Sequence, residues 1–218
     1  MIDSSSLEVL LVPKNYLIPE ITVTPKKKTE LVISQYKTSQ IYNYTGCCSP
    51  QIFARYFPYK DEYQSISFIK SIKLKTYSKI ESCFNLRFLT VNPKGEPGTD
   101  ILKDNLVIKV KKGRRNLVID NFNSTQIQIP QQGLFIAVEF LIIKENEIEM
   151  WGNNIDINKK MKFTTYMPFI GAQKNEDVNN GWVYAGGKWE NNEFGRVIAK
   201  MTKKNMNYCI AMEVVLSN

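Results

Sequence analysis

Short runs of alternating apolar and polar residues, separated by turn signals, fill the segment from Ser65 to Ile143. Successive side chains of a β-strand point to opposite faces, so this period-two pattern is typical of strands that bury one face. Turn signals between closely spaced runs favour hairpins over parallel crossovers. The pattern therefore predicts an all-β fold, an antiparallel β-sandwich with jelly-roll-like connections. The expected strands are 72–77, 84–91, 106–110, 117–120, 127–129 and 134–143, with a Pro- and Gly-rich turn at 92–100.

The same alternation predicts the core, and it leaves two charges inside otherwise apolar strands. Arg87 and Glu139 each stand between two apolar residues, so strand parity points both away from the face that carries those neighbours. We expect the two charges on one sheet face. An ion pair that fixes strand packing is the favoured interpretation, and the polar part of a ligand site is the alternative. The expected core residues are Ile72, Leu74, Phe84, Leu86, Phe88, Ile108, Val110, Leu117, Ile119, Ile136, Val138 and Phe140.

The segments on either side of this region are less regular. Residues 31–63 are rich in turn-forming residues, so the sandwich is expected to begin near Ser65. An Asn- and Gly-rich loop is expected at 171–187, with Trp182, Tyr184 and Trp189 around it, and a last strand at 208–216. No helix of convincing length is predicted.

Histidine is absent, and this excludes several classes of site. Ser-His-Asp and Cys-His nucleophilic arrangements need a histidine, as do zinc sites that use one. The four cysteines, at 47, 48, 83 and 209, form no CxxC pair, so no zinc, iron–sulfur or other cofactor is expected. Free thiols are favoured over a disulfide. Residues 153–158 are rich in oxygen donors, which leaves a structural calcium site open, although a turn is favoured.

The net charge of +8 raises the question of a nucleic-acid partner. The basic residues are spread along the chain, and Lys109 and Lys111 share one strand face, as lysines on a solvated edge do. No groove-reading motif is present, so no nucleic-acid partner is expected. No apolar run approaches the length of a membrane-spanning helix, and the first residues lack the basic region of a signal peptide.

Residues 1–28 contain Pro13, Tyr16-Leu17 and Glu20–Pro25 before a run of lysines. They resemble the closing strands of a carboxypeptidase regulatory-like domain, a prealbumin-like sandwich of Gram-negative envelope proteins. Residues 29–218 resemble the uncharacterised β-sandwich that follows such a domain, although Gly46–Pro50 departs from its glycine-rich pattern. The matching features are 84–89, 93–98, 105–108, 117–120, 129–130, 133–141 and 184–189.

This resemblance implies two units, a remnant of the regulatory-like domain with a linker at 1–28 and the sandwich at 29–218. It also implies a location in the periplasm, at the outer membrane or on the cell surface, and no known catalytic activity. Since the upstream strands of the regulatory-like domain are missing, the chain is expected to be a fragment or a degenerate form.

Two classes of function remain. The first is a non-catalytic binding module for a glycan or a partner envelope protein, in which aromatic rings in loop-rich sequence provide flat apolar contacts. Its candidate ligand-binding residues are Trp151, Trp182, Tyr184, Trp189, Arg87 and Glu139. Tyr166 is a further aromatic residue in loop-rich sequence. The alternative is a glycan or peptide hydrolase that uses two carboxylates. Its candidates are Glu139, Glu147, Glu149 and Asp156. Two acids clustered with an aromatic-lined cleft would favour the hydrolase, and a flat aromatic patch without acids would favour the module.

Overall fold

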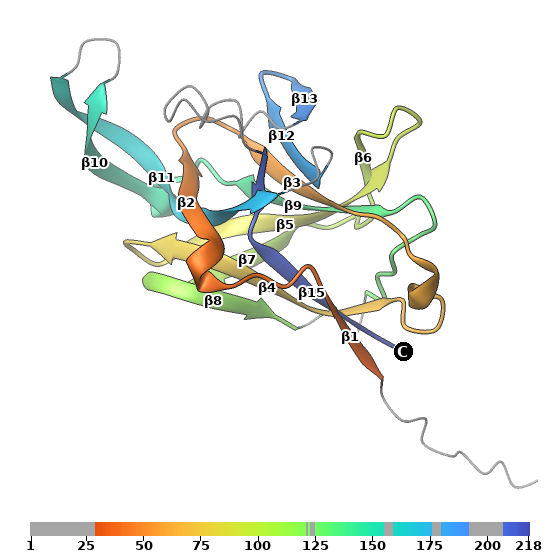
Figure 1. Ribbon diagram of the computed structural model, residues 1–218. Helices are drawn as coiled ribbons and strands as arrows, with labels where there is room; N and C mark the ends of the chain where they lie inside the picture. Colours follow the sequence, from red (N-terminus) through yellow and green to blue (C-terminus); the bar gives the residue numbers. More distant parts are fainter. Residues whose placement is uncertain (1–28, 121, 123–124, 155–158, 176–179, 192–206) are drawn as a thin grey trace, which may run out of the picture.

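The computed structural model describes residues 29–120, 122, 125–154, 159–175, 180–191 and 207–218. Two antiparallel sheets pack against each other in this part of the chain (Figure 1), which confirms the predicted all-β sandwich. The chain changes sheet repeatedly as it runs from one strand to the next, as a jelly-roll-like connectivity requires. Residues 1–28, predicted to be a separate remnant, lie outside the described residues.

The first sheet has the hydrogen-bonded order β1-β15-β4-β11-β10, with β2 and β14 also pairing with β11 and β8 pairing with β4. The long strand β11 extends with β10 into a hairpin that projects from the sandwich (Figure 1). The strands of this sheet are β1 (Glu30–Ile33), β2 (Ile41–Cys47), β4 (Phe68–Ser78), β8 (Gly113–Ile119), β10 (Glu147–Asn154), β11 (Lys159–Asn175), β14 (Asn207–Ile210) and β15 (Met212–Ser217).

The second sheet has the order β13-β12-β3-β9-β5-β6, with β7 pairing with β5. Among the described residues, the 3-10 turn η1 (Thr38–Gln40) lies between β1 and β2 of the first sheet. The turns η2 (Asp61–Tyr63) and η3 (Lys144–Asn146) each lie between strands of different sheets. The strands of the second sheet are β3 (Ile52–Phe57), β5 (Ser82–Val91), β6 (Pro97–Asp100), β7 (Leu106–Val110), β9 (Leu134–Phe140), β12 (Gly181–Ala185) and β13 (Lys188–Asn191).

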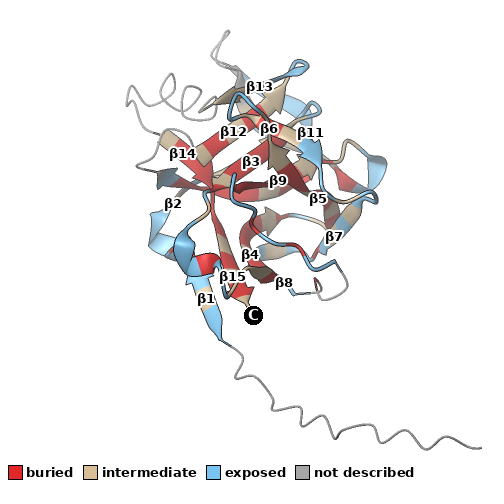
Figure 2. Cartoon of the chain, turned by 90° about the vertical axis from the view of Figure 1, so that its right-hand side faces the viewer, coloured by how far each residue is buried: buried red, intermediate tan, exposed pale blue. Residues whose placement is uncertain are grey.

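The core lies where the two sheets face each other, and Figure 2 shows the buried stretches running through the middle of the molecule. Ten of the twelve predicted core residues are buried, while Ile108 and Leu117 are partly buried and pack against the same cluster. Alternation placed these side chains correctly because a shift by one residue would turn a whole strand's apolar set to the wrong face.

The predicted start of the sandwich near Ser65 is wrong, because β1, β2 and β3 precede it and belong to both sheets. Strand β3 is buried along almost its whole length, so its sequence lacks the alternation that marks a half-buried strand. The expected strand at 127–129 is only an isolated bridge between Phe68 and Gln128. The expected turn at 92–100 ends in a strand, β6.

Arg55 of β3 is a charge that the sequence did not mark as buried. Its side chain is 5% exposed, and Nη1 donates hydrogen bonds to the carbonyl oxygens of Ile210 at 3.3 Å and Met212 at 2.7 Å. These carbonyls flank Ala211, where β14 ends and β15 begins. Burial lowers the pKa of Arg55. The arginine thus satisfies buried backbone acceptors at a break between two strands.

The three cysteines whose side chains are described, Cys48, Cys83 and Cys209, are free thiols. Cys209 is buried, and burial raises its thiol pKa, with Arg55 acting in the opposite direction. Cys83 is half-buried, and its backbone N–H and carbonyl both bond to the side chain of Asn146. These contacts are structural, in line with the favoured interpretation of the cysteines.

Candidate binding face on the second sheet

The outer face of the second sheet carries a second apolar cluster, separate from the core. Its buried members are Ile52, Ala54, Leu89, Phe135 and Ala137. Four half-buried aromatic rings pack against this cluster: Tyr56, Trp182, Tyr184 and Trp189. We call these four rings, together with the buried ring of Phe135, the aromatic face. Large apolar side chains on the outer side of a sheet in contact with solvent are typical of a recognition surface.

The rings of the aromatic face contact one another edge to face or tilted. The ring centroids of Tyr184 and Trp189 are 5.3 Å apart, those of Phe135 and Trp182 are 6.0 Å apart, and those of Tyr56 and Phe135 are 5.0 Å apart. Strand pairing produces this arrangement, since Tyr184 lies opposite Trp189 in the β12–β13 hairpin. Such contacts fix the rings before any ligand arrives.

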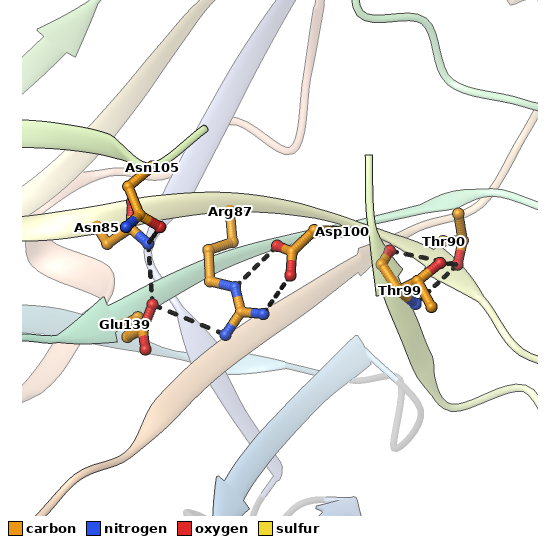
Figure 3. A network of polar contacts seen from close by, with 7 residues as sticks. All are labelled: Asn85, Arg87, Thr90, Thr99, Asp100, Asn105 and Glu139. Atoms are coloured by element: carbon orange, nitrogen blue, oxygen red, sulfur yellow. Dashed lines mark hydrogen bonds and ion pairs between the residues drawn. The ribbon is translucent and has the colours of Figure 1, made fainter. Parts of the chain in front are cut away.

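Arg87 of β5 is the centre of a polar network on the same outer face (Figure 3). Its Nε donates to Oδ1 of Asp100 at 2.8 Å, Nη2 pairs with Oδ2 of the same carboxylate, and Nη1 lies 3.7 Å from Oε2 of Glu139. Asn85 donates from Nδ2 to Glu139 at 2.9 Å and to Asn105 at 3.0 Å. We call these five residues the Arg87 network.

The prediction that Arg87 and Glu139 lie on one sheet face is confirmed. The hydrogen bond to Asp100 is the first cause that raises the pKa of Arg87, and the charges of Asp100 and Glu139 add to it, against the effect of burial. The side chains of Arg87 and Glu139 are 24% and 34% exposed, so solvent still reaches this ion pair. The guanidinium fills the space between two carboxylates.

Strand register places the aromatic face and the Arg87 network side by side. Ile52 of β3 pairs with Tyr184 on one side and with Glu139 on the other. In the next row, two alanines, Ala54 and Ala137, separate Trp182 from Arg87. Three strand spacings of about 4.8 Å put these two residues roughly 14 Å apart. Rings and polar groups therefore border a strip of short side chains.

The structure brings together five of the six predicted ligand-binding residues. Trp182, Tyr184 and Trp189 lie on strands of one hairpin, so their expected placement in a loop at 171–187 is wrong; β11 reaches Asn175 and β12 begins at Gly181. Trp151 is not part of this face. It is 70% exposed on β10 of the first sheet, opposite Lys162. Tyr166 also lies on the first sheet, in β11.

Sequence reasoning missed Asp100, Asn85 and Asn105, three of the five network residues. Asn85 has the same parity as Arg87 in one strand, which was a sufficient signal. Asp100 stands at the end of a Pro- and Gly-rich stretch that was expected to be all turn, so its place in a strand was hidden. Asn105 precedes β7, and the sequence carries no signal for its contact with Asn85.

The other candidate acids of a hydrolase are dispersed. Glu147 pairs with Lys144 at 2.9 Å and Glu149 with Lys162 at 2.5 Å, both on the first sheet or beside it, and Asp156 lies outside the described residues. Within the described ranges no group of three or more Cys, Asp or Glu could hold a metal ion. Residues 155–158 of the alternative calcium loop are not among those described. In the described part of the chain no helix is long and apolar enough to span a membrane.

No protein-family model matches the chain, and a search of curated proteins also finds no match. Among solved structures, the chain is similar to the cysteine protease and lectin-like domains of Cwp84, a surface layer associated protein of Clostridium difficile, at 10% sequence identity and a TM-score of 0.48. The similarity covers 78% of this chain and 32% of that chain, so this chain spans about a third of its length. At this identity and score, the likeness adds nothing to the assignment of function.

Proposed function

We propose that the outer face of the second sheet binds a glycan and that the protein is a non-catalytic binding module. The observation that carries the proposal is the row of half-buried rings, Trp182, Tyr184 and Trp189, beside the Arg87 network on one sheet face. A surface of this kind offers both apolar and polar contacts to the same ligand. Large pockets are not needed for such recognition, because extended ligands lie along a face.

The chemistry of a sugar ring matches this surface. A pyranose has an apolar face of C–H groups that packs on an aromatic ring, and an edge of hydroxyls that donate and accept hydrogen bonds. The carboxylates of Asp100 and Glu139 accept hydrogen bonds, and the amides of Asn85 and Asn105 both donate and accept them. Roughly 14 Å between Trp182 and Arg87 leaves room for more than one sugar ring.

The same geometry disfavours the hydrolase alternative. A glycosidase needs two carboxylates with the glycosidic bond, and in some enzymes a water, between them. Asp100 and Glu139 are the two acids in the Arg87 network, and the Arg87 guanidinium occupies the space between them (Figure 3). The bidentate contact to Asp100 is the kind that holds an arginine in place. The arrangement of these side chains therefore favours a binding role over a hydrolytic one.

We assign the module to the bacterial cell envelope, in the periplasm, at the outer membrane or on the cell surface. Support for this location comes from the resemblance of residues 1–28 and 29–218 to envelope proteins with a carboxypeptidase regulatory-like domain. An envelope protein that carries a glycan could bind through that glycan to the same face. Localisation of the full-length protein by cell fractionation tests this part of the proposal independently of binding.

Binding is tested on an immobilised panel of cellulose, xylan, mannan, chitin oligosaccharides and peptidoglycan fragments, followed by calorimetry with the best soluble ligand. Trp189→Ala and Tyr184→Ala are each expected to weaken binding about tenfold, because each removes a ring from the centre of the contact. Trp151→Ala is the matched control, since it removes an exposed tryptophan from the other sheet. That variant is expected to bind like the wild type.

Two results would overturn the proposal. One is the absence of binding to every glycan of the panel by a folded protein. The other is an equal loss in the Trp151 and Trp189 variants, which would show that binding depends on exposed tryptophan in general. Release of reducing ends from a bound glycan would instead support the hydrolase alternative, and Glu139→Gln would then abolish that release.

A further inference from the structure

The outer face of the first sheet, on the opposite side of the sandwich, carries a cluster of rings around an arginine. The guanidinium carbon of Arg114 lies 5.5 Å from the ring centroid of Tyr44 and 5.6 Å from that of Tyr77. The two tyrosine rings meet edge to face at 5.8 Å, and the Phe169 ring is 6.4 Å from Tyr77. Together with Lys75, these residues form what we call the cationic–aromatic patch.

Register and glycines build this patch into the fold. Tyr77 of β4 pairs with Arg114 of β8 on one side and with Phe169 of β11 on the other. A Cβ at Gly46 would lie 1.8 Å from the Phe169 ring, so only glycine lets that ring lie across β2. A Cβ at Gly171 would lie 2.9 Å from the Cβ and Cγ atoms of Lys75. Glycine at both positions allows the rings and the lysine stem to pack flat on the strands.

Two positive charges of the patch have no carboxylate partner among the described residues. Lys75 is 7% exposed, and its Nζ makes one described hydrogen bond, to Oδ1 of Asn116 at 3.0 Å. Arg114 makes ring contacts but no described ion pair. Lys73, one step along the same face of β4, is different, because its Nζ pairs with both oxygens of Glu213 at 2.9 and 3.0 Å.

Lys75 and Arg114 are diagonal neighbours across β4 and β8. Lys75 pairs with Asn116 and Tyr77 pairs with Arg114, so the two cations stand in adjacent rows on one face. A buried ammonium ion with one neutral partner is costly unless another group of opposite charge approaches it. The rings of Tyr44 and Tyr77 hold the guanidinium in place, which reduces the entropy lost when a ligand binds.

We propose that the cationic–aromatic patch is a second binding site, specific for an oxyanion: a sulfate, phosphate or carboxylate group held between the Arg114 guanidinium and the Lys75 ammonium. Oxyanions accept charge-assisted hydrogen bonds from both groups, and a planar guanidinium can engage two oxygens at once. This site lies on the other sheet from the glycan-binding face and does not depend on that proposal. The surrounding rings favour an anion attached to an organic group over a free ion.

Heteronuclear NMR of the full chain, titrated with sodium sulfate, phosphate and acetate at constant ionic strength set by chloride, tests the site. We expect saturable shifts at the Arg114 side-chain N–H and at the backbone amides of Lys75 and Asn116. The anion with the lowest dissociation constant identifies the class. Arg114→Ala and Lys75→Met are each expected to weaken binding about tenfold; the methionine keeps the apolar stem over Gly171.

Arg115→Ala is the matched control. Arg115 is the next residue of β8, is exposed, and bonds to the backbone oxygen of Lys112, so its loss removes the same charge without touching the patch. It is expected to leave the dissociation constant unchanged. Equal weakening in the Arg114 and Arg115 variants would overturn the proposal, because it indicates diffuse attraction to a basic protein. So would shifts that rise linearly with every anion and never saturate.

Discussion

At the scale of single residues, the contacts of Arg87 distinguish a structural role from a ligand-binding role for the charges on the outer face. It contacts Asp100 through two nitrogens and Glu139 through one at 3.7 Å, while solvent reaches all three side chains. A bidentate ion pair makes two hydrogen bonds for about the same loss of side-chain entropy as a single contact, so it is the stronger of the two. The Asp100 contact therefore holds the arginine, and Glu139 keeps oxygens that a ligand can reach.

A double-mutant cycle measures these two contacts. We expect Arg87→Ala and Glu139→Ala to couple by about 0.5 kcal/mol in the free energy of unfolding, and Arg87→Ala and Asp100→Ala by about 1 kcal/mol. Urea unfolding of the single and double variants provides the values. Additive effects in both cycles would show that the network contributes nothing to stability and would remove its structural role.

Phe88, the next residue of β5, tests the prediction from strand parity on the face that points into the core. It is fully buried, and its ring meets that of Phe122 edge to face at 5.7 Å. Phe88→Ala is expected to lower the free energy of unfolding by about 3–5 kcal/mol, because it removes buried area and leaves a cavity. Val107→Ala, on an exposed side chain of β7, is the comparison and is expected to cost little. A loss below about 1 kcal/mol for Phe88→Ala would contradict its place in the core.

At the scale of elements, two kinds of sequence pattern predicted strands of the core. Strands β4 and β5 alternate between apolar and polar residues along much of their length, so parity identified their core faces and the outward Arg87. Strand β9 is buried along almost its whole length, and its apolar run, interrupted by Glu139, marked it instead. The β12–β13 hairpin was expected to be a loop because each strand is short and the region is rich in Asn and Gly. Its contacts with β3 come from residues more than a hundred positions away, which local pattern cannot supply.

A signal for that hairpin was nevertheless present in Gly186-Gly187. Ala185 pairs with Lys188, so the two glycines form a two-residue turn, and their φ angles of 59° and 84° are both positive. This is the combination that a type I′ hairpin turn requires, and Gly-Gly is one of its preferred sequences. The turn brings Tyr184 and Trp189 opposite each other, and the aromatic face depends on it.

Gly187→Val is expected to loosen the hairpin, since a β-branched residue is strained at φ of 84°. Hydrogen exchange of the β12 and β13 amides would rise, and glycan binding would weaken together with it. Gly186→Asn is the matched control, because Asn-Gly satisfies the same turn and should leave exchange unchanged. Unchanged exchange in the valine variant would show that the turn does not hold the hairpin.

At the scale of the whole molecule, the turn-rich composition of residues 31–63 hid the strands with which the sandwich begins. Turn-forming residues there surround β1, β2 and β3, which contribute to both sheets and close the sandwich. Strand β1 pairs with β15 near the C-terminal end, so the two ends of the described sandwich hold each other. Pairing across such a separation depends on the complete fold.

Four tyrosines, two of them buried and two half-buried, predict how the stability of the protein depends on pH. Burial is the first cause that raises the hydroxyl pKa of Tyr36, Tyr44, Tyr56 and Tyr63 above 10.0, the ordinary value. An unfolded chain releases these protons at a lower pH than the folded one does. Their contribution is therefore complete below about pH 10 and is lost as pH rises, so the free energy of unfolding should fall in alkali.

Tyr36→Phe isolates one of these groups. The Tyr36 hydroxyl is buried without a hydrogen-bond partner among the described residues, so its removal should not destabilise the protein at pH 7. The pKa of Tyr36 is also raised by the charge of Glu213. Between about pH 10.5 and 11.5, the variant should lose stability less steeply than the wild type, by up to about 1.4 kcal/mol per pH unit. Urea unfolding at stepped pH measures both slopes, and identical slopes would show that Tyr36 ionises in the folded protein as readily as in the unfolded chain.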